Sequence, residues 1–276
     1  MQRSLTDLEK INIICDYKSG LGLADLVVKY GRTRKSLWQF LRRRGATIRE
    51  IQGSRKHRFD DKYFAAIDTP DKAYWLGFIY ADGNVYSRTF SINLSRKDRQ
   101  HLVLLSATLK YSGDLEDRFY IRKGKKILLT RFRLNSVKFC NALGSHGVVP
   151  RKSLIIRMPS IAKNLIRDFI RGYLDGDGWI TKKQRSGNRY EWTVGFVSGS
   201  EIFIREIKKH IQYLCSISTG SVYKIKNKNA WQLTFDGNRV SKVISACLYY
   251  DGCVALERKR KKAQDCSLSL EEVSNG

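Results

Sequence analysis

Two aspartates occupy matching places in the sequence. Asp82 ends the stretch "WLGFIYAD", Asp177 ends the stretch "IRGYLDGD", and a glycine follows each of them. Each stretch has the pattern of a helix, so both carboxylates are expected at helix C-termini, where they oppose the partial negative charge at a cost of about 0.3–1 kcal/mol. A divalent cation would remove this penalty, because Mg²⁺ prefers carboxylate, carbonyl and water oxygens. The pattern therefore predicts a metal site that Asp82 and Asp177 share.

Other interpretations of these acidic residues must be weighed. Glycine-flanked aspartates also cap helices and form turns, and for either copy alone that interpretation stays open. A calcium-binding loop counted from Asp175 would need a glutamate at its twelfth position, which is Ser186, so such a loop is excluded. Asp175 has Tyr80 as its counterpart in the first copy, so the shared chemistry is assigned to Asp82 and Asp177 alone.

Small residues precede each aspartate at helical spacing. Gly77 and Ala81 stand one helical turn apart, and so do Gly172 and Gly176. Small residues at this spacing let two helix backbones approach closely. We therefore expect the two helices to pack across a pseudo-twofold axis, with Gly77 and Gly172 in the seam. The glycine that follows each aspartate is expected in the left-handed conformation that ends a helix.

The same order of elements follows each aspartate. A strand with alternating apolar residues comes first, over 90–94 in one copy and 192–196 in the other. Each strand leads to a helix with a predicted capping box, at Ser95 and at Ser198. A hairpin comes next in each copy, with turns at Gly124 and at 227–229, and a last helix follows. The sequence thus predicts an α+β protein built from a duplicated αββαββα repeat, over 61–152 and 153–265.

The charge of the chain indicates its class of partner. The 276 residues include 52 Lys and Arg against 26 Asp and Glu, a formal net charge of +26. With 42% hydrophobic residues the chain is not mainly disordered. The excess charge therefore favours a polyanionic partner, nucleic acid first and a membrane surface second. Because no apolar run approaches the ~20 residues of a spanning helix, and the N-terminus lacks a signal-peptide core, no membrane association is expected.

The six cysteines and four histidines are dispersed along the chain. Without a CxxC pair, a zinc site or a disulfide framework is not expected, and reduced thiols in a cytoplasmic compartment are the better interpretation. Scattered histidines also disfavour nuclease chemistry that depends on histidine.

Residues 1–45 have the pattern of three short helices. The first two end at Gly20 and Gly31, and Thr33 is the predicted N-cap of the third. A short second helix, a glycine turn and a basic third helix resemble a helix-turn-helix DNA-binding module, although a generic basic three-helix unit has the same pattern. A basic linker is expected at 46–60 and a polar tail at 266–276. The third helix would present these side chains outward: Arg34, Lys35, Gln39, Arg42 and Arg43.

The two aspartate stretches resemble the motif helices of the LAGLIDADG homing endonucleases, in the monomeric form with two motifs. The resemblance spans roughly residues 60–262. It implies a saddle of two four-stranded antiparallel sheets that straddles DNA, with the motif helices at its centre. It also implies that Asp82 with the Ala81 carbonyl, and Asp177 with the Gly176 carbonyl, bind Mg²⁺. Mn²⁺ would then substitute, Ca²⁺ would bind without cleavage, and each site would cut one strand.

Family members also tend to place a lysine near each active site. The stretch "VVPRKSLIIRMPSI" resembles the family segment before the second motif and nominates Lys152, and "ALERKRKKA" nominates Lys259. Such a lysine would polarise the phosphate or orient water. Arg258, Arg260 and Lys261 are alternatives to Lys259, and simple contact with the DNA backbone is the alternative role for either lysine.

Strand residues that alternate with the apolar ones are expected to face DNA, because a ribbon fits the major groove. Arg and Gln can make bidentate base contacts, whereas Lys more often contacts phosphate. An exposed charged strand face without a ligand is the alternative. The candidates are Ser91, Asn93, Arg131 and Arg133 in the first repeat, and Arg189, Glu191, Thr193, Lys224, Lys226, Gln232 and Thr234 in the second.

The expected function is that of a Mg²⁺-dependent, site-specific endonuclease that acts on double-stranded DNA as a monomer. Two alternatives on the same scaffold remain. One is a DNA-binding regulator that does not cut, and the other is a maturase that binds intron RNA.

Overall fold

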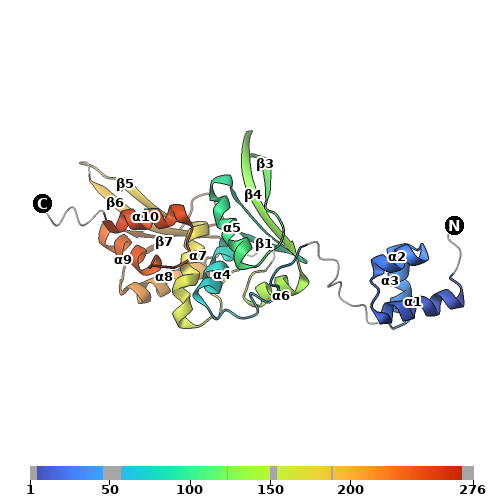
Figure 1. The fold of residues 1–276 in the computed structure, drawn as a ribbon. Helices are drawn as coiled ribbons and strands as arrows, with labels where there is room; N and C mark the ends of the chain where they lie inside the picture. Colours follow the sequence, from blue (N-terminus) through green and yellow to red (C-terminus); the bar gives the residue numbers. More distant parts are fainter. Residues whose placement is uncertain (1–4, 46–56, 123, 150–153, 188, 269–276) are drawn as a thin grey trace. The chain divides into compact units, whose positions relative to one another are not determined.

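The structure is a computed structural model, and it describes residues 5–45, 57–122, 124–149, 154–187 and 189–268. The chain divides into two compact units, Met1–Arg58 and Phe59–Gly276 (Figure 1). The second unit contains both aspartate stretches.

The described part of the first unit consists of three short helices: α1 (Asp7–Ser19), α2 (Leu23–Tyr30) and α3 (Arg34–Arg43). They end and begin where the sequence predicts. Gly20 and Gly31 cap α1 and α2 at positive φ, and the Thr33 hydroxyl accepts a hydrogen bond from the Ser36 amide at 3.2 Å at the start of α3. Their common core consists of Ile13, Tyr17, Leu23, Leu26, Leu37 and Leu41.

The second unit contains the predicted repeat twice (Figure 1). The first copy consists of α4 (Pro70–Asp82), β1 (Gly83–Tyr86), β2 (Thr89–Ser95), α5 (Arg99–Thr108), β3 (Glu116–Arg122), β4 (Lys125–Asn135) and α6 (Val137–Ser145). The second consists of α7 (Ile166–Asp177), β5 (Gly178–Gln184), β6 (Tyr190–Ser198), α8 (Glu201–Cys215), β7 (Ser221–Lys224), β8 (Trp231–Asp236) and α9 (Asn238–Leu248). A further helix, α10 (Glu257–Leu268), follows the second copy. No helix in the described part of the chain has the length and apolarity needed to cross a membrane.

Each copy forms one antiparallel sheet of four strands, with the orders β1-β2-β4-β3 and β5-β6-β8-β7. The sheets are built alike: Phe90 of β2 pairs with Leu134 of β4, and Val194 of β6 pairs with Phe235 of β8. These apolar residues are buried and pack with residues of the helices in one core. The α+β fold with two four-stranded antiparallel sheets is thus confirmed.

Two predicted capping boxes are wrong. The N-cap of α8 is Ser200 rather than Ser198, because β6 continues through Ser198, and the Ser200 hydroxyl accepts from the Phe203 amide at 3.3 Å. In the first copy Ser95 precedes a short 3-10 turn and its side chain makes no capping hydrogen bond.

The glycines after the two aspartates also differ from expectation. Gly83 (φ −74°, ψ 140°) and Gly178 (φ −114°, ψ −177°) are extended rather than left-handed, because each one starts a strand directly. Glycine is needed there for space. A β-carbon on Gly83 would lie 2.5 Å from the Ile79 carbonyl oxygen, and one on Gly178 would lie 2.8 Å from the Leu174 carbonyl oxygen.

Candidate active site

Helices α4 and α7 lie side by side in the second unit (Figure 1), and their backbones touch at two glycines. A β-carbon on Gly77 would clash with the Phe169 carbonyl, and one on Gly172 would clash with the Tyr74 carbonyl. The contacts are reciprocal, since Tyr74 and Phe169 occupy the same position in the two repeats. Both glycines therefore lie in a pseudo-symmetric seam that has no room for a side chain.

The seam brings the two motif aspartates together. α4 ends at Asp82 and α7 ends at Asp177, and the Asp82 Oδ2 atom lies 3.1 Å from the point that a β-carbon on Gly176 would occupy. Both carboxylates act on the same hydroxyl: the pKa of Tyr173 is raised by burial first, then by the charge of Asp177 and also by that of Asp82. Asp82 and Asp177 are half-buried, so a ligand can reach them from solvent.

The atoms at these helix ends suit a hard divalent cation. Two carboxylates and the main-chain carbonyls of a last helical turn are the oxygen ligands that Mg²⁺ prefers. The capping amides bond to the carbonyls of Ile79 and Leu174, so these hydrogen bonds stop before the carbonyls of Ala81 and Gly176. Among the described residues, no group of three or more His, Cys, Asp or Glu side chains comes together. An ion at this place would therefore take its remaining ligands from water or a substrate.

Lys259 reaches the end of α7 from α10. It is only 4% exposed, and its Nζ atom donates to the Leu174 carbonyl at 2.8 Å and to the Gly178 carbonyl at 2.5 Å. Burial lowers the pKa of Lys259 to about 8, while the charges of Asp175 and Asp82 act to raise it. The two hydrogen bonds thus hold the ammonium group at the C-terminal end of α7, where Asp177 is the last residue.

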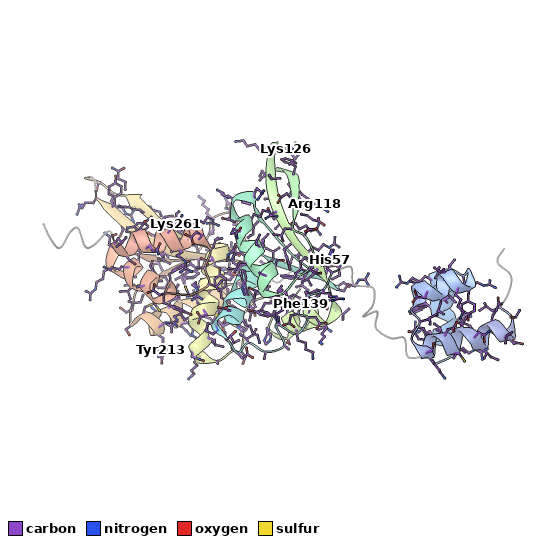
Figure 2. All side chains as sticks on the ribbon, in the orientation of Figure 1. His57, Arg118, Lys126, Phe139, Tyr213 and Lys261 are labelled. Atoms are coloured by element: carbon purple, nitrogen blue, oxygen red, sulfur yellow. The ribbon has the colours of Figure 1, made fainter. Side chains whose placement is uncertain are left out.

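The other candidates for this cation lie elsewhere. Arg258 pairs with a carboxylate of the first repeat, and Arg260 donates to a main-chain carbonyl just before α10. Lys261 lies on the outer side of α10 with 70% of its side chain exposed (Figure 2). Of these four basic residues, Lys259 is the one that bonds to the end of α7. Lys152 lies outside the described residues.

Asp175 is fully buried next to the site. Its carboxylate accepts hydrogen bonds from the Tyr74 hydroxyl at 2.8 Å, the Tyr249 hydroxyl at 2.6 Å and the Leu256 amide at 2.6 Å. Sequence reasoning missed this network, because its donors come from three distant segments and leave no local pattern.

The predicted DNA-contacting residues of the sheets differ in exposure. Asn93, Arg133, Arg189, Lys224 and Lys226 are exposed, and Arg131, Glu191 and Gln232 are half-buried. Three shorter side chains are buried: Ser91 (7% exposed), Thr193 (1%) and Thr234 (7%). The Thr193 hydroxyl donates to the Asp236 carboxylate at 2.7 Å instead. These three side chains are short and add little to the exposed outer surface, and their contact with DNA stays a prediction.

The register of β7 corrects a further prediction. Tyr223 pairs with Gln232, and Lys224 pairs with Trp231. Opposed residues of neighbouring strands project from the same face, so Tyr223 shares the outer face with Gln232, whereas Lys224 shares the core-facing side with Trp231. The Gln232 side-chain amide donates to the Tyr223 hydroxyl across this pair. The sequence pattern missed Tyr223 because a strand of four residues does not by itself fix its register.

Helix α3 in the first unit has one basic and one apolar side. Leu37 and Leu41 are buried in the core of this unit, and the Arg42 guanidinium lies 5.1 Å from the centre of the Trp38 ring. All five polar residues predicted to point outward are exposed: Arg34, Lys35, Gln39, Arg42 and Arg43.

Comparison with known proteins shows what this geometry is similar to. Residues 164–243 match the model of a LAGLIDADG-like domain, a stretch that holds Asp177 and all four strands of the second sheet. The LAGLIDADG homing endonuclease I-GzeII, solved in complex with its DNA target, superposes with a TM-score of 0.52 at 11% identity, over 76% of this chain and 92% of that chain. A double mutant of I-SmaMI gives a TM-score of 0.51 at 13% identity, over 74% and 92%. This chain has the LAGLIDADG fold.

The resemblance predicted from the two motif helices is therefore confirmed. The LAGLIDADG fold extends over both repeats, although the family model matches the second repeat alone. The meganuclease I-SmaMI bound to uncleaveable DNA is a further structure with this fold, at a TM-score of 0.50 and 11% identity, over 74% of this chain and 91% of that one. No curated protein sequence matches the chain.

Proposed function

We propose that this LAGLIDADG protein is a site-specific endonuclease that cuts both strands of double-stranded DNA with the help of a divalent metal ion. One observation carries the proposal: the reciprocal glycine seam brings the carboxylates of Asp82 and Asp177 together, with the ammonium group of Lys259 beside the same helix end. Such a group suits phosphodiester hydrolysis, in which negative charge develops on the phosphate and on the leaving oxygen. Relatives with this fold have been solved in complexes with DNA, which supports DNA as the substrate.

Each repeat contributes one aspartate and one carbonyl to the proposed metal site. Asp82 with Ala81, and Asp177 with Gly176, would hold Mg²⁺, which when bound supplies an activated water and offsets charge on the phosphate. Because the two aspartates leave different helices, one would serve each DNA strand. Lys259 would polarise a phosphate oxygen or orient the water, since two carbonyls fix its ammonium group at the end of α7.

The outer faces of the two sheets would position the DNA. In the first sheet Asn93 pairs with Arg131, and Arg133 lies two residues further along the same strand. In the second sheet Gln232 of β8 takes the place of Arg131, with Tyr223 beside it on β7. The β3–β4 hairpin, marked by Arg118 and Lys126 in Figure 2, extends away from the helices and would continue this surface along the duplex.

The first unit would add a second DNA contact. Its third helix presents exposed basic residues on one side only, which suits a helix-turn-helix recognition helix in the major groove. This unit would lengthen the target beyond the base pairs that the sheets contact.

A cleavage assay tests the proposal. Its substrate is a DNA duplex in which the two sequences that flank the protein's own gene are joined directly, without the gene between them. The purified protein should cut this duplex with Mg²⁺ or Mn²⁺, should bind without cutting in Ca²⁺, and should be inactive in EDTA. Asp82→Asn and Asp177→Asn should each abolish double-strand cleavage and leave binding largely intact. Asp71→Asn, an exposed aspartate in the first turn of α4, is the matched control and should cut normally.

The same experiment separates the alternatives. Tight, specific binding without cutting under any metal would favour a regulator and overturn the endonuclease. Splicing of an intron RNA by the protein would add a maturase activity. The Asp82→Asn and Asp177→Asn substitutions should leave that activity unaffected.

A further inference from the structure

The buried carboxylate of Asp175 is tied to the segment that carries Lys259. Leu256 immediately precedes α10, and its amide donates to Asp175 Oδ2 at 2.6 Å. The Leu256 carbonyl in turn accepts the Lys259 amide at 2.8 Å. Asp175 therefore holds the residue on which the first turn of α10 is built, and Lys259 lies in that turn.

The position of the carboxylate itself is fixed from two sides. The Tyr249 hydroxyl donates to Oδ1 at 2.6 Å, and the Tyr74 hydroxyl donates to Oδ2 at 2.8 Å. Tyr74 belongs to the first repeat, and its hydroxyl also lies 2.9 Å from Nε2 of His101. With these donors and no exposed surface, Asp175 has no freedom to turn away from Leu256.

A second contact keeps α10 attached to the protein independently of Asp175. The Arg258 guanidinium Nε atom lies 3.0 and 3.1 Å from the two carboxylate oxygens of Asp98 in the first repeat. Loss of the Asp175 carboxylate would therefore shift the first turn of α10 without detaching the helix.

The two repeats differ at this position. Tyr80 stands where the second repeat has Asp175, and its hydroxyl donates to the His146 carbonyl at 2.5 Å. The first repeat thus ties its motif helix to the end of α6, whereas the second ties its motif helix to α10.

We propose that Asp175 is the positioning residue for Lys259. By accepting the hydrogen bond from the Leu256 amide, Asp175 holds the first turn of α10 where the Lys259 ammonium group reaches the end of α7. The inference rests on the proposed endonuclease function. Because Tyr80 replaces Asp175 in the other repeat, Asp175 serves one of the two sites, and its loss slows the cut on one strand more than on the other.

The test uses the full chain and a duplex target with a separate label on each strand. Asp175→Asn, Lys259→Ala and the double variant are compared with the wild type in single-turnover cleavage. Asp175→Asn should slow the same strand that Lys259→Ala slows, by about 10- to 100-fold, because a small displacement of a catalytic group has an effect of this size. The double variant should cut no more slowly than Lys259→Ala alone, since Asp175 acts through Lys259.

A general structural role would give a different result. Equal slowing of both strands by Asp175→Asn, which leaves the strand ratio unchanged, would overturn the proposal. A double variant that cuts more slowly than Lys259→Ala alone would also overturn it. Tyr249→Phe removes one donor and keeps the ring, so it should slow the same strand less. If Asp175→Asn does not fold, as judged by circular dichroism, the strand ratio of Tyr249→Phe decides.

Amide hydrogen exchange gives a readout that needs no cleavage. The amides of residues 256–260 should exchange faster in Asp175→Asn than in the wild type, while the α4 amides do not change. A wild type that never cuts would refute the endonuclease function, and unchanged exchange at 256–260 would separately refute the contact on which this proposal is built.

Discussion

The Asp82 carboxylate lies 3.1 Å from the point that a β-carbon on Gly176 would occupy. That β-carbon would also clash with the side chain of Ala81, so the last turns of α4 and α7 touch just where the two aspartates leave their helices. The spacing of the carboxylates is consequently set by main-chain packing. It depends on the small residues at positions 81 and 176 as much as on the acids themselves.

Gly176→Ala should slow cleavage of both strands by about 10-fold or more, because the added methyl group must displace Asp82 or push the helices apart. Single-turnover rates with Mg²⁺ measure the effect, and binding in Ca²⁺ should change little. Gly144→Ala is the matched control: it also adds a methyl group to a helix, but nothing lies within 4 Å of it. This control should cut normally and gain up to about 1 kcal/mol of stability. Wild-type rates in Gly176→Ala would contradict the packing argument.

Gln232→Ala should relax the sequence preference at one or two base pairs of the half-site bound by the second sheet, by about 1–3 kcal/mol per base pair. Gln232 lies on the outer face with Tyr223, so its amide is placed to contact a base edge. Cleavage of a set of singly substituted targets measures this change. Lys224→Ala, on the other face of the same pair of strands, should leave the preference as it is, and a shift at the same base pairs would show that the assigned faces are wrong.

Deletion of residues 1–45 should weaken binding to a long target while a short core site is still cut. The exposed basic side of α3 accounts for the loss, since each Lys or Arg that contacts phosphate contributes about one to the slope of log affinity against log salt. In the full chain, Arg42→Ala with Arg43→Ala should lower that slope by about two. Lys10→Ala is the control, because its ammonium group pairs with Asp7 at 2.7 Å on α1. Unchanged affinity and slope after the deletion would refute the proposed role of this unit.

Acid should destabilise the protein through His101. Burial lowers the pKa of His101 from 6.5 to about 3, so the folded ring stays neutral at pH values where the unfolded one takes up a proton. Its contribution is thus fully present above about pH 6.5 and is lost as the pH falls toward 3, by up to about 1.4 kcal/mol per unit. Denaturant unfolding of the wild type and of His101→Gln measures this between about pH 6.5 and 4.5. Other titrating groups cancel in the difference, and a difference that does not depend on pH would contradict the assignment.

Repetition made the centre of the molecule predictable. One aspartate between glycines has several explanations, but Asp82 and Asp177 stand in two stretches that share their small residues, their following strand and their hairpin. Gly77 and Gly172 could be placed in a seam for the same reason, because small residues one turn apart have a direct structural consequence. Helix ends such as those at Gly31 and Thr33 depend on local hydrogen bonds, so the sequence predicts them equally well.

The features that the sequence did not predict depend on contacts between distant segments. Gly83 and Gly178 were expected to be left-handed, but the next strand begins at once and keeps them extended. The face of Tyr223 depends on its pairing with β8, which alternation within four residues cannot determine. The bond from Leu256 to Asp175 joins segments far apart in the sequence, so no pattern along the chain predicts it.

The two outer hairpins are of unequal size: β3 and β4 have 7 and 11 residues, whereas β7 and β8 have 4 and 6. At about 3.3 Å per residue, the first hairpin would follow a duplex several base pairs further than the second. A palindrome would leave this longer arm without a matching half. The preferred target should instead be asymmetric, with one extended arm, and the protein would settle on it in a single orientation.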